Sequence, residues 1–277
     1  MTCPKMTRNA DRGKPTSPMA YYQSGEDRAM PNLLPIMVSL AAHAGPTTLL
    51  QDLSAWRAHR MTETAPAIPA SAYQSALNGE IASGIEVVPE VKAAKGYGVS
   101  VVNAPIATVW KAVADEDHHA NALPISQSMT VQGRARSPDH TVFQYMNVPL
   151  LTDRWWLVRI RYNSNLYAAS GGRAWELVWE DRLKDAELRS TIRPELVEDG
   201  MPIAWSKGAW LLVDLGDGRT LIEYHTWSDP GGNVPAGPAS RFAAGEVKNN
   251  LRSIADFARR HTPTCGGTYV RPDGTPL

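Results

Sequence analysis

The sequence has little cysteine, little phenylalanine and no net charge. It holds two cysteines and three phenylalanines among 277 residues, and 28 Lys and Arg balance 28 Asp and Glu. The cysteines, Cys3 and Cys265, stand near opposite ends, which excludes a disulfide framework and leaves open a single clasp between them. Zero net charge argues against a nucleic acid or an anionic membrane held by bulk electrostatics. We therefore expect no nucleic-acid partner.

Motifs of several enzyme and metal-site classes are also missing. The sequence contains no G-x-S-x-G, no H-E-x-x-H, no C-x-x-C and no Walker A motif. The run Asp115–His119 combines three acids with two histidines, but it follows the end of a helical pattern, and adjacent histidines rarely point at one ion. We interpret it as a solvated loop, and expect neither a metal nor a cofactor.

No stretch has the roughly 20 apolar residues that span a bilayer. The apolar run within Leu33–Ala44 is about 8–12 residues long and ends in Ala42-His43-Ala44, the form of a secretory signal peptide. An ordinary amphipathic helix is the alternative. If translation starts near Met30 and this run is a signal peptide, we expect a periplasmic or secreted protein. If not, we expect a cytoplasmic protein.

The pattern of apolar residues predicts one domain between two extensions. We expect a disordered extension with the signal candidate over 1–44, the domain over 45–261 and a flexible C-terminal tail over 262–277. Helical patterns occupy 47–60, 71–78, 105–114 and a long final stretch from Pro238 to His261. Strand patterns occupy 81–88, 97–103, 125–136, 140–148, 151–162, 173–180, 187–194, 210–215 and 220–228.

Strands with one heavy apolar face predict a sheet wrapped around the last helix. Trp156 shares a face with Val158 and Ile160, and Trp175 shares one with Leu177 and Trp179. The final helix has its own stripe, in steps of three and four residues. Nine Trp and nine Tyr suit a surface that is part apolar and part polar. The sequence leaves open whether side chains fill the space between the sheet and the final helix or whether an apolar pocket remains there.

Three motifs stand in an order that resembles a known family. Residues 103–110 read N-A-P-x-x-x-V-W, and residues 148–156 read V-P-x-x-T-D-R-W-W. Segment 229–251 begins D-P-G-G-x-V-P and ends Asn250-Leu251. Together they resemble the openings, middle strand and finish of bacterial-type START-like lipid-binding domains, which belong to the Bet v 1-like (SRPBCC) helix-grip superfamily. One departure is Trp155, which stands where the family has a second aspartate, so Arg154 has no assigned ionic partner.

The resemblance implies an α+β helix-grip fold, with a curved antiparallel sheet around a long C-terminal helix and N-terminal helices. It implies that the protein binds, and as a further step transports, a hydrophobic lipid-like or sterol-like molecule in a tunnel between sheet and helix, with transient membrane contact. Arg154 is then either a polar anchor for the ligand or a structural residue. The implied ligand-binding residues are Arg154, Trp156, Trp179, Tyr224, Val247 and Leu251.

Two other functions remain open at this stage. Relatives with this fold include cyclases, dehydratases and hydrolases that act on apolar aromatic or polyketide-like substrates. Such an enzyme needs an acid or base in the pocket, and the candidates are Glu223, Tyr224 and His225. Since Glu223 and His225 are two residues apart, they share one strand face, and a solvated face or a structural histidine is the simpler explanation for them. The third function is an accessory protein whose filled core binds nothing.

Overall fold

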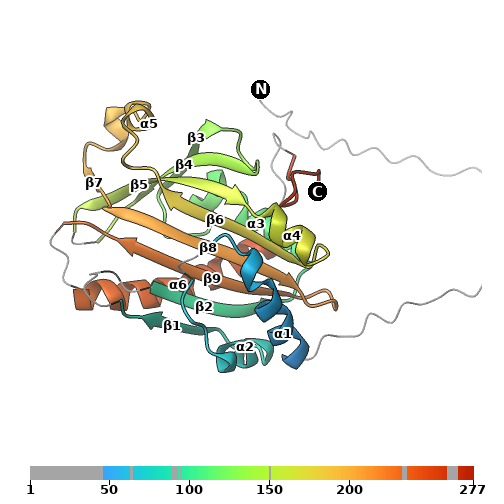
Figure 1. Ribbon diagram of the computed structural model, residues 1–277. Helices are drawn as coiled ribbons and strands as arrows, with labels where there is room; N and C mark the ends of the chain where they lie inside the picture. The colour runs from blue at the N-terminus through green and yellow to red at the C-terminus, as the bar shows by residue number, and fades with distance from the viewer. Residues whose placement is uncertain are drawn as a thin grey trace, which may run out of the picture. The chain divides into compact units, whose positions relative to one another are not determined.

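The computed structural model describes residues 46–62, 65–88, 93, 95–149, 151–232, 236–260 and 268–277 (Figure 1). These residues belong to one compact unit. The signal-peptide candidate and both cysteines lie outside the described ranges. Among the described helices, none combines the length and the hydropathy that crossing a bilayer requires.

A nine-stranded sheet forms the centre of the described fold, in the order β1-β2-β9-β8-β6-β5-β4-β3. Neighbours on this path run antiparallel, and the short β7 pairs parallel to β5. The strands are β1 (Ala82–Glu86), β2 (Lys95–Val102), β3 (Gln127–Gly133), β4 (Asp139–Met146), β5 (Asp153–Tyr162), β6 (Ala174–Asp181), β7 (Gly200–Pro202), β8 (Trp205–Asp214) and β9 (Thr220–Asp229). The expected curved antiparallel sheet is confirmed.

Helices lie on both faces of this sheet (Figure 1). They are α1 (Pro46–Trp56), η1 (Arg57–His59), α2 (Ala70–Leu77), α3 (Ile106–Val113), η2 (Glu116–Asn121), α4 (Ser164–Ala169), α5 (Ala186–Ser190), η3 (Pro194–Leu196) and α6 (Ala236–Arg260). The N-terminal helices α1 and α2 cover the outer face, and α3 and α6 cover the concave face. The predicted N-terminal helices and long final helix are therefore confirmed.

The buried stripe of α6 fixes the helix against β2. Val247, Leu251 and Ile254 are at most 1% exposed and join the main core with Val109 and Trp110 of α3. A Cβ atom at Gly98 of β2 would lie 2.6 Å from Leu251 and 2.7 Å from Val247. Glycine at this position lets the helix approach the strand closely.

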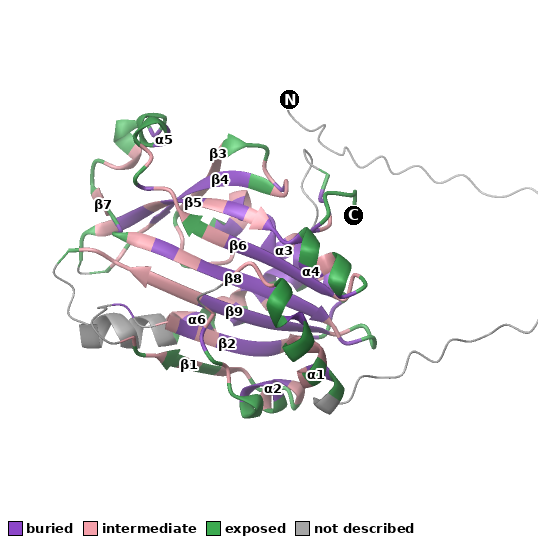
Figure 2. Cartoon of the chain, in the orientation of Figure 1, coloured by how far each residue is buried: buried purple, intermediate pink, exposed green. Residues whose placement is uncertain are grey.

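A second core lies on the outer face, beneath α1 and α2. It contains Leu49 and Ala76 from these helices and Leu211, Val213 and Leu221 from the central strands. Because both faces of the central strands are covered, most of β8 and the first half of β9 are buried (Figure 2). The sheet therefore separates two apolar layers.

Two segments have helices where the sequence pattern did not predict them. The predicted strand at 187–194 is wrong, because α5 and a turn occupy it. Asp185 caps α5 by accepting a hydrogen bond from the Leu188 amide, and Asn163 caps the unpredicted α4 by accepting one from the Leu166 amide. Local capping therefore determined both short helices.

The C-terminal residues 268–277 pack against α3, where the sequence suggested a flexible tail. The indole N–H of Trp110 donates to the Val270 carbonyl at 2.8 Å, and the Tyr269 hydroxyl donates to Asp115 at 2.9 Å. Tyr269 and Val270 are about as buried as the main core. This segment therefore covers the helix that carries the N-A-P-x-x-x-V-W motif.

Candidate functional site

A cavity of about 430 Å³ lies between the concave face of the sheet, α6 and the segment that joins η2 to β3. Its size falls in the range of roughly 300–1,000 Å³ that small-molecule sites occupy. The lining is mainly apolar, with side chains from β4, β5, β6, β8 and β9. The concave face is therefore not completely filled.

Four of the six predicted ligand-binding residues line this cavity. They are Arg154, Trp156, Trp179 and Tyr224. Val247 and Leu251 do not line it, because their side chains pack toward Gly98 of β2. Strand alternation in β5, β6 and β9 places these four residues on the concave face. The apolar stripe of the helix did not distinguish the cavity from the packed part of the core.

Two tryptophans of the lining have their indole N–H groups paired. The Trp156 indole N–H donates to Gln144 at 2.8 Å, and that of Trp179 donates to Ser206 at 3.1 Å. The Tyr224 ring stacks on Trp179 with centroids 5.8 Å apart. With their polar atoms paired, these side chains present mainly apolar surface to the cavity.

Arg154 holds a loop in place at one end of the cavity. Its Nε donates to the Pro230 carbonyl at 2.8 Å, and its Nη1 donates to the carbonyls of Thr152 and Asp153. The side chain joins the start of β5 to the D-P-G-G loop, and it makes no ion pair with any carboxylate of the described residues. Trp155, which replaces the family's aspartate, is buried on the opposite face of β5. These contacts support a structural role, and the position in the lining leaves a ligand contact as a proposal.

The two ends of the cavity differ in burial. Arg154 and Ile160 both line it and are six residues apart on β5, which corresponds to roughly 20 Å. Near Arg154, Leu151 is 55% exposed, whereas Ile160 and Val113 at the other end are buried. We call these the open end and the buried end.

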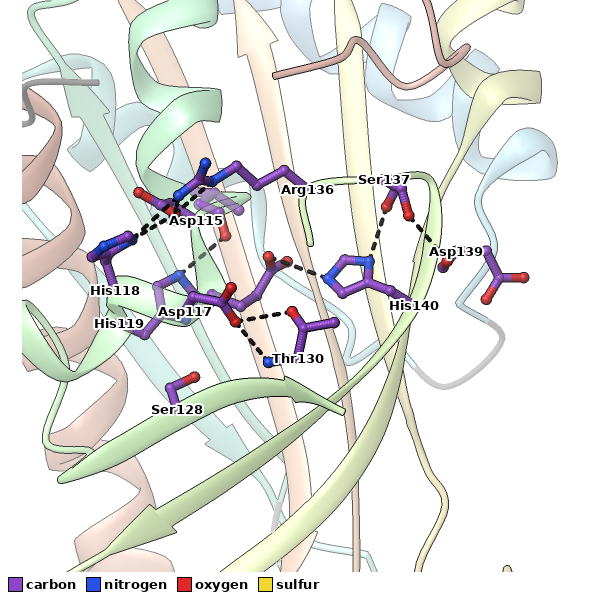
Figure 3. A network of polar contacts seen from close by, with 12 residues as sticks. Asp115, Asp117, His118, His119, Ser128, Thr130, Arg136, Ser137, Asp139 and His140 are labelled. Atoms are coloured by element: carbon purple, nitrogen blue, oxygen red, sulfur yellow. Dashed lines mark hydrogen bonds and ion pairs between the residues drawn. The ribbon is translucent and has the colours of Figure 1, made fainter. Parts of the chain in front are cut away.

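Polar residues surround the buried end, where the sequence suggested a solvated loop. That prediction is wrong, because Asp115, Glu116 and His119 are at most 4% exposed. Asp115 accepts hydrogen bonds from His118 and Arg136 (Figure 3), and it accepts another from the Tyr269 hydroxyl. Burial alone would raise the pKa of Asp115, and these three donors outweigh burial and hold it below its usual range.

Two residues of this cluster, Glu116 and His119, line the cavity itself. The His119 Nε2 lies 3.1 Å from the Val113 carbonyl and 3.3 Å from that of Ala112, so this nitrogen carries the proton and donates. Within the described part of the chain, no three His, Cys, Asp or Glu side chains gather as a metal site would require.

Sequence reasoning missed Glu116, His119 and Gln144 as lining residues. The alternation of β4 places Gln144 on the same face as Val142 and Met146, so its position was predictable. Glu116 and His119 follow the end of α3, where neither helical nor strand periodicity predicts the direction of a side chain. The turn that brings them inward becomes visible only in the folded chain.

The predicted acid–base candidates are divided between the two faces of the sheet. Tyr224 lines the cavity, and its hydroxyl accepts from the Asn250 amide at 3.3 Å. Glu223 and His225 are 1% and 2% exposed and share one strand face, as the alternation predicted, and this is the outer face of the sheet. They are not solvated. Neither of them can reach a molecule in the cavity.

Glu223 belongs to a buried ionic network beneath the N-terminal helices. Arg60 donates to Glu176 at 2.8 Å and to Glu223 at 2.5 Å, and the Tyr73 hydroxyl donates to Glu223 at 2.7 Å. Burial would raise the pKa of Glu223, but Arg60, with help from His225 and Tyr73, lowers it. The network therefore places two buried carboxylates around one guanidinium group.

His225 predicts a specific dependence of stability on pH. Burial, and after it the positive charge of Arg60, lowers the pKa of His225 to about 4 in the folded protein. An unfolded histidine has a pKa near 6.5, so the unfolded chain binds the proton first. The contribution of neutral His225 to the free energy of unfolding is therefore fully present above pH 6.5. It is lost as the pH falls to about 4, and the loss amounts to up to about 3 kcal/mol.

Urea unfolding between pH 7 and pH 4.5 checks this prediction. The wild type is expected to lose more stability over this range than His225→Phe does. The control, His59→Phe, replaces an exposed histidine and is expected to keep the wild-type dependence. Equal pH slopes for the wild type and His225→Phe would show that His225 does not carry the effect.

Comparisons with known proteins place the fold. No family model and no curated protein matches the sequence. Among solved structures, a fragment of the STAR-related lipid transfer protein from Xanthomonas axonopodis matches with a TM-score of 0.54 and 17% identity, over 65% of this chain and 93% of that one. Human STARD10 matches with a TM-score of 0.52 and 10% identity, over 72% and 84%. Human StAR-related lipid transfer protein 5 matches with 0.52 and 8%, over 78% and 97%. At these identities, what the proteins share is the fold.

Proposed function

We propose, for a chain with the START-like fold, that the protein binds one hydrophobic small molecule in the cavity between the sheet and α6. The observation that carries the proposal is the cavity of about 430 Å³, which interrupts an otherwise closely packed core. A filled-core accessory protein would leave no such space, since native interiors pack with few voids larger than a water molecule.

The chemistry of the lining supports a mainly apolar ligand. Trp156, Trp179 and Tyr224 supply ring surface, and Val158 and Leu177 supply aliphatic surface. Burying apolar ligand area against these side chains contributes roughly 25 cal/mol per Å². The structural neighbours with lipid-transfer names are consistent with a lipid-like or sterol-like ligand, and transport with transient membrane contact extends the same proposal.

Native mass spectrometry of the purified protein tests the proposal. The expected result is a complex with one apolar molecule, which organic extraction then identifies. A protein that is purified empty and also fails to take up Nile red would contradict the proposal. Nile red suits the test because its fluorescence rises in an apolar site.

An enzyme of the same superfamily, acting on an apolar aromatic or polyketide-like substrate, is the second candidate. The observation in its favour is that Glu116 and His119, which can exchange protons, touch the cavity. They replace Glu223 and His225, which lie on the other face of the sheet. A substrate would be converted and released, so turnover of an extracted compound by the purified protein would favour this candidate over simple binding.

A further inference from the structure

The side chain of Trp210 forms part of the cavity wall at its buried end. Trp210 lies on β8, directly opposite Leu177 of β6 and Tyr224 of β9, and all three residues line the cavity. Leu177 pairs in turn with Tyr162, which is two residues beyond Ile160 on β5. Since Ile160 marks the buried end, the indole ring of Trp210 lies at that end as well.

The indole N–H of Trp210 has no hydrogen-bond partner in the described part of the chain. It is also not among the unpaired polar atoms that the protein seals from water. Because Trp210 is only 4% exposed and lines the cavity, this N–H is reached from the cavity. The two other tryptophans of the lining, Trp156 and Trp179, donate to Gln144 and Ser206. An indole nitrogen donates and cannot accept, so Trp210 requires an acceptor from a ligand.

The surroundings of this N–H determine which acceptor suits it. Leu177 is apolar, and the ring centroid of Tyr224 lies 4.1 Å from that of Trp210. A carboxylate would lose its water against such a wall without gaining a cation. The unpaired oxygens of Glu116, Glu246 and Asn250 are sealed from water, so none of them can accept the proton of a ligand hydroxyl group. A carbonyl oxygen accepts and has no proton to place, so it fits better than an acid or an alcohol.

We propose that the ligand carries a neutral carbonyl group, as an apolar ketone does, and that its oxygen accepts a hydrogen bond from Nε1 of Trp210 at the buried end. This inference rests on the proposed binding function and names the chemical class of the ligand. The carbonyl group enters first, and the hydrocarbon chain lies along β5 toward the open end. The ligand thereby pairs a donor that the protein leaves unpaired.

Displacement of Nile red by two ligands of the same shape tests the proposal. Tridecan-2-one carries the carbonyl oxygen, and 2-methyltridec-1-ene has a methylene group in its place. Trp210→Phe removes the N–H and keeps an aromatic ring. It is expected to weaken binding of the ketone about three- to tenfold relative to the alkene, which is the range of one neutral hydrogen bond. The ratio of the two affinities isolates the hydrogen bond, because both ligands experience the same change in cavity size.

Trp175→Phe is the matched control, since Trp175 is buried, lies outside the cavity lining and donates to the Gly172 carbonyl at 2.7 Å. It is expected to keep the wild-type ratio, and circular dichroism checks that both variants fold. Infrared spectroscopy of the wild type gives a second readout that needs no variant. The carbonyl band of bound tridecan-2-one, labelled with ¹³C at the carbonyl, is expected at a lower frequency than in hexane.

The possible outcomes separate this proposal from the function on which it depends. A wild-type ratio in Trp210→Phe, or a carbonyl band at the hexane frequency, would overturn the role of Trp210 and leave the binding function standing. Displacement of Nile red by neither compound would do the same. A wild-type protein that binds neither Nile red nor either compound would overturn both proposals.

Discussion

Replacing Arg60 with methionine is expected to lower the free energy of unfolding by about 3–5 kcal/mol. Arg60 is the cation that both Glu176 and Glu223 contact, and those carboxylates are at most 1% exposed. Without it, two buried carboxylates, on β6 and β9 with β8 between them, keep only neutral donors. Urea unfolding at pH 7, followed by tryptophan fluorescence, measures the effect.

The control for this variant is Arg57→Met, one turn earlier in the same segment. Arg57 is exposed, so its replacement is expected to change stability by less than about 0.5 kcal/mol. An Arg60→Met protein as stable as Arg57→Met would show that the ionic network does not stabilise the outer layer. The result would also report on the attachment of η1, because Arg60 contacts both β6 and β9.

Filling the cavity with Thr226→Trp is expected to reduce ligand affinity at least about tenfold. Thr226 lines the cavity, and its partners on the flanking strands are Gly96 and Gly208, which have no side chains. Because these partners carry no side chains, a large ring at 226 can be accommodated on this face of the sheet, where the cavity lies. Displacing two buried methylene groups of a ligand, at about 0.8 kcal/mol each, already accounts for roughly a tenfold loss.

The matched control is Lys207→Trp, which adds the same ring on the opposite face of the sheet. It is expected to leave the Nile red titration and the native mass spectrum unchanged. If Thr226→Trp bound the ligand as tightly as the wild type, the ligand would lie elsewhere than in this cavity. Circular dichroism checks that both variants fold.

The strand alternation and the long helical stripe predicted most of the fold. Trp156, Val158 and Ile160 repeat every second residue, so their common face was determined by backbone geometry alone. The predicted strand at 210–215 was too short, since β8 begins at Trp205. Its first half contains Ser206-Lys207-Gly208, which has no apolar alternation, and Gly208 is covered by the Trp179 ring from the neighbouring strand.

The buried end of the site could not be predicted in the same way. Asp115 and Glu116 look like solvated acids because, apart from His118, nothing nearby in the sequence pairs with them. Their partners Arg136, His140 and Tyr269 lie 20 or more residues away in the printed sequence. Contacts of this kind depend on the tertiary fold, and no local period encodes them.

The burial of β9 on both faces has a consequence for anyone who wishes to redesign the ligand preference. From Thr220 to His225 every residue is buried, and the side chains alternate between the cavity side and the ionic network. A substitution here disturbs one packed layer or the other. Leu123 and Leu151 line the same cavity from loops and are partly or well exposed to solvent. Libraries directed at these loop positions should therefore yield more folded variants with altered selectivity than libraries directed at the central strands.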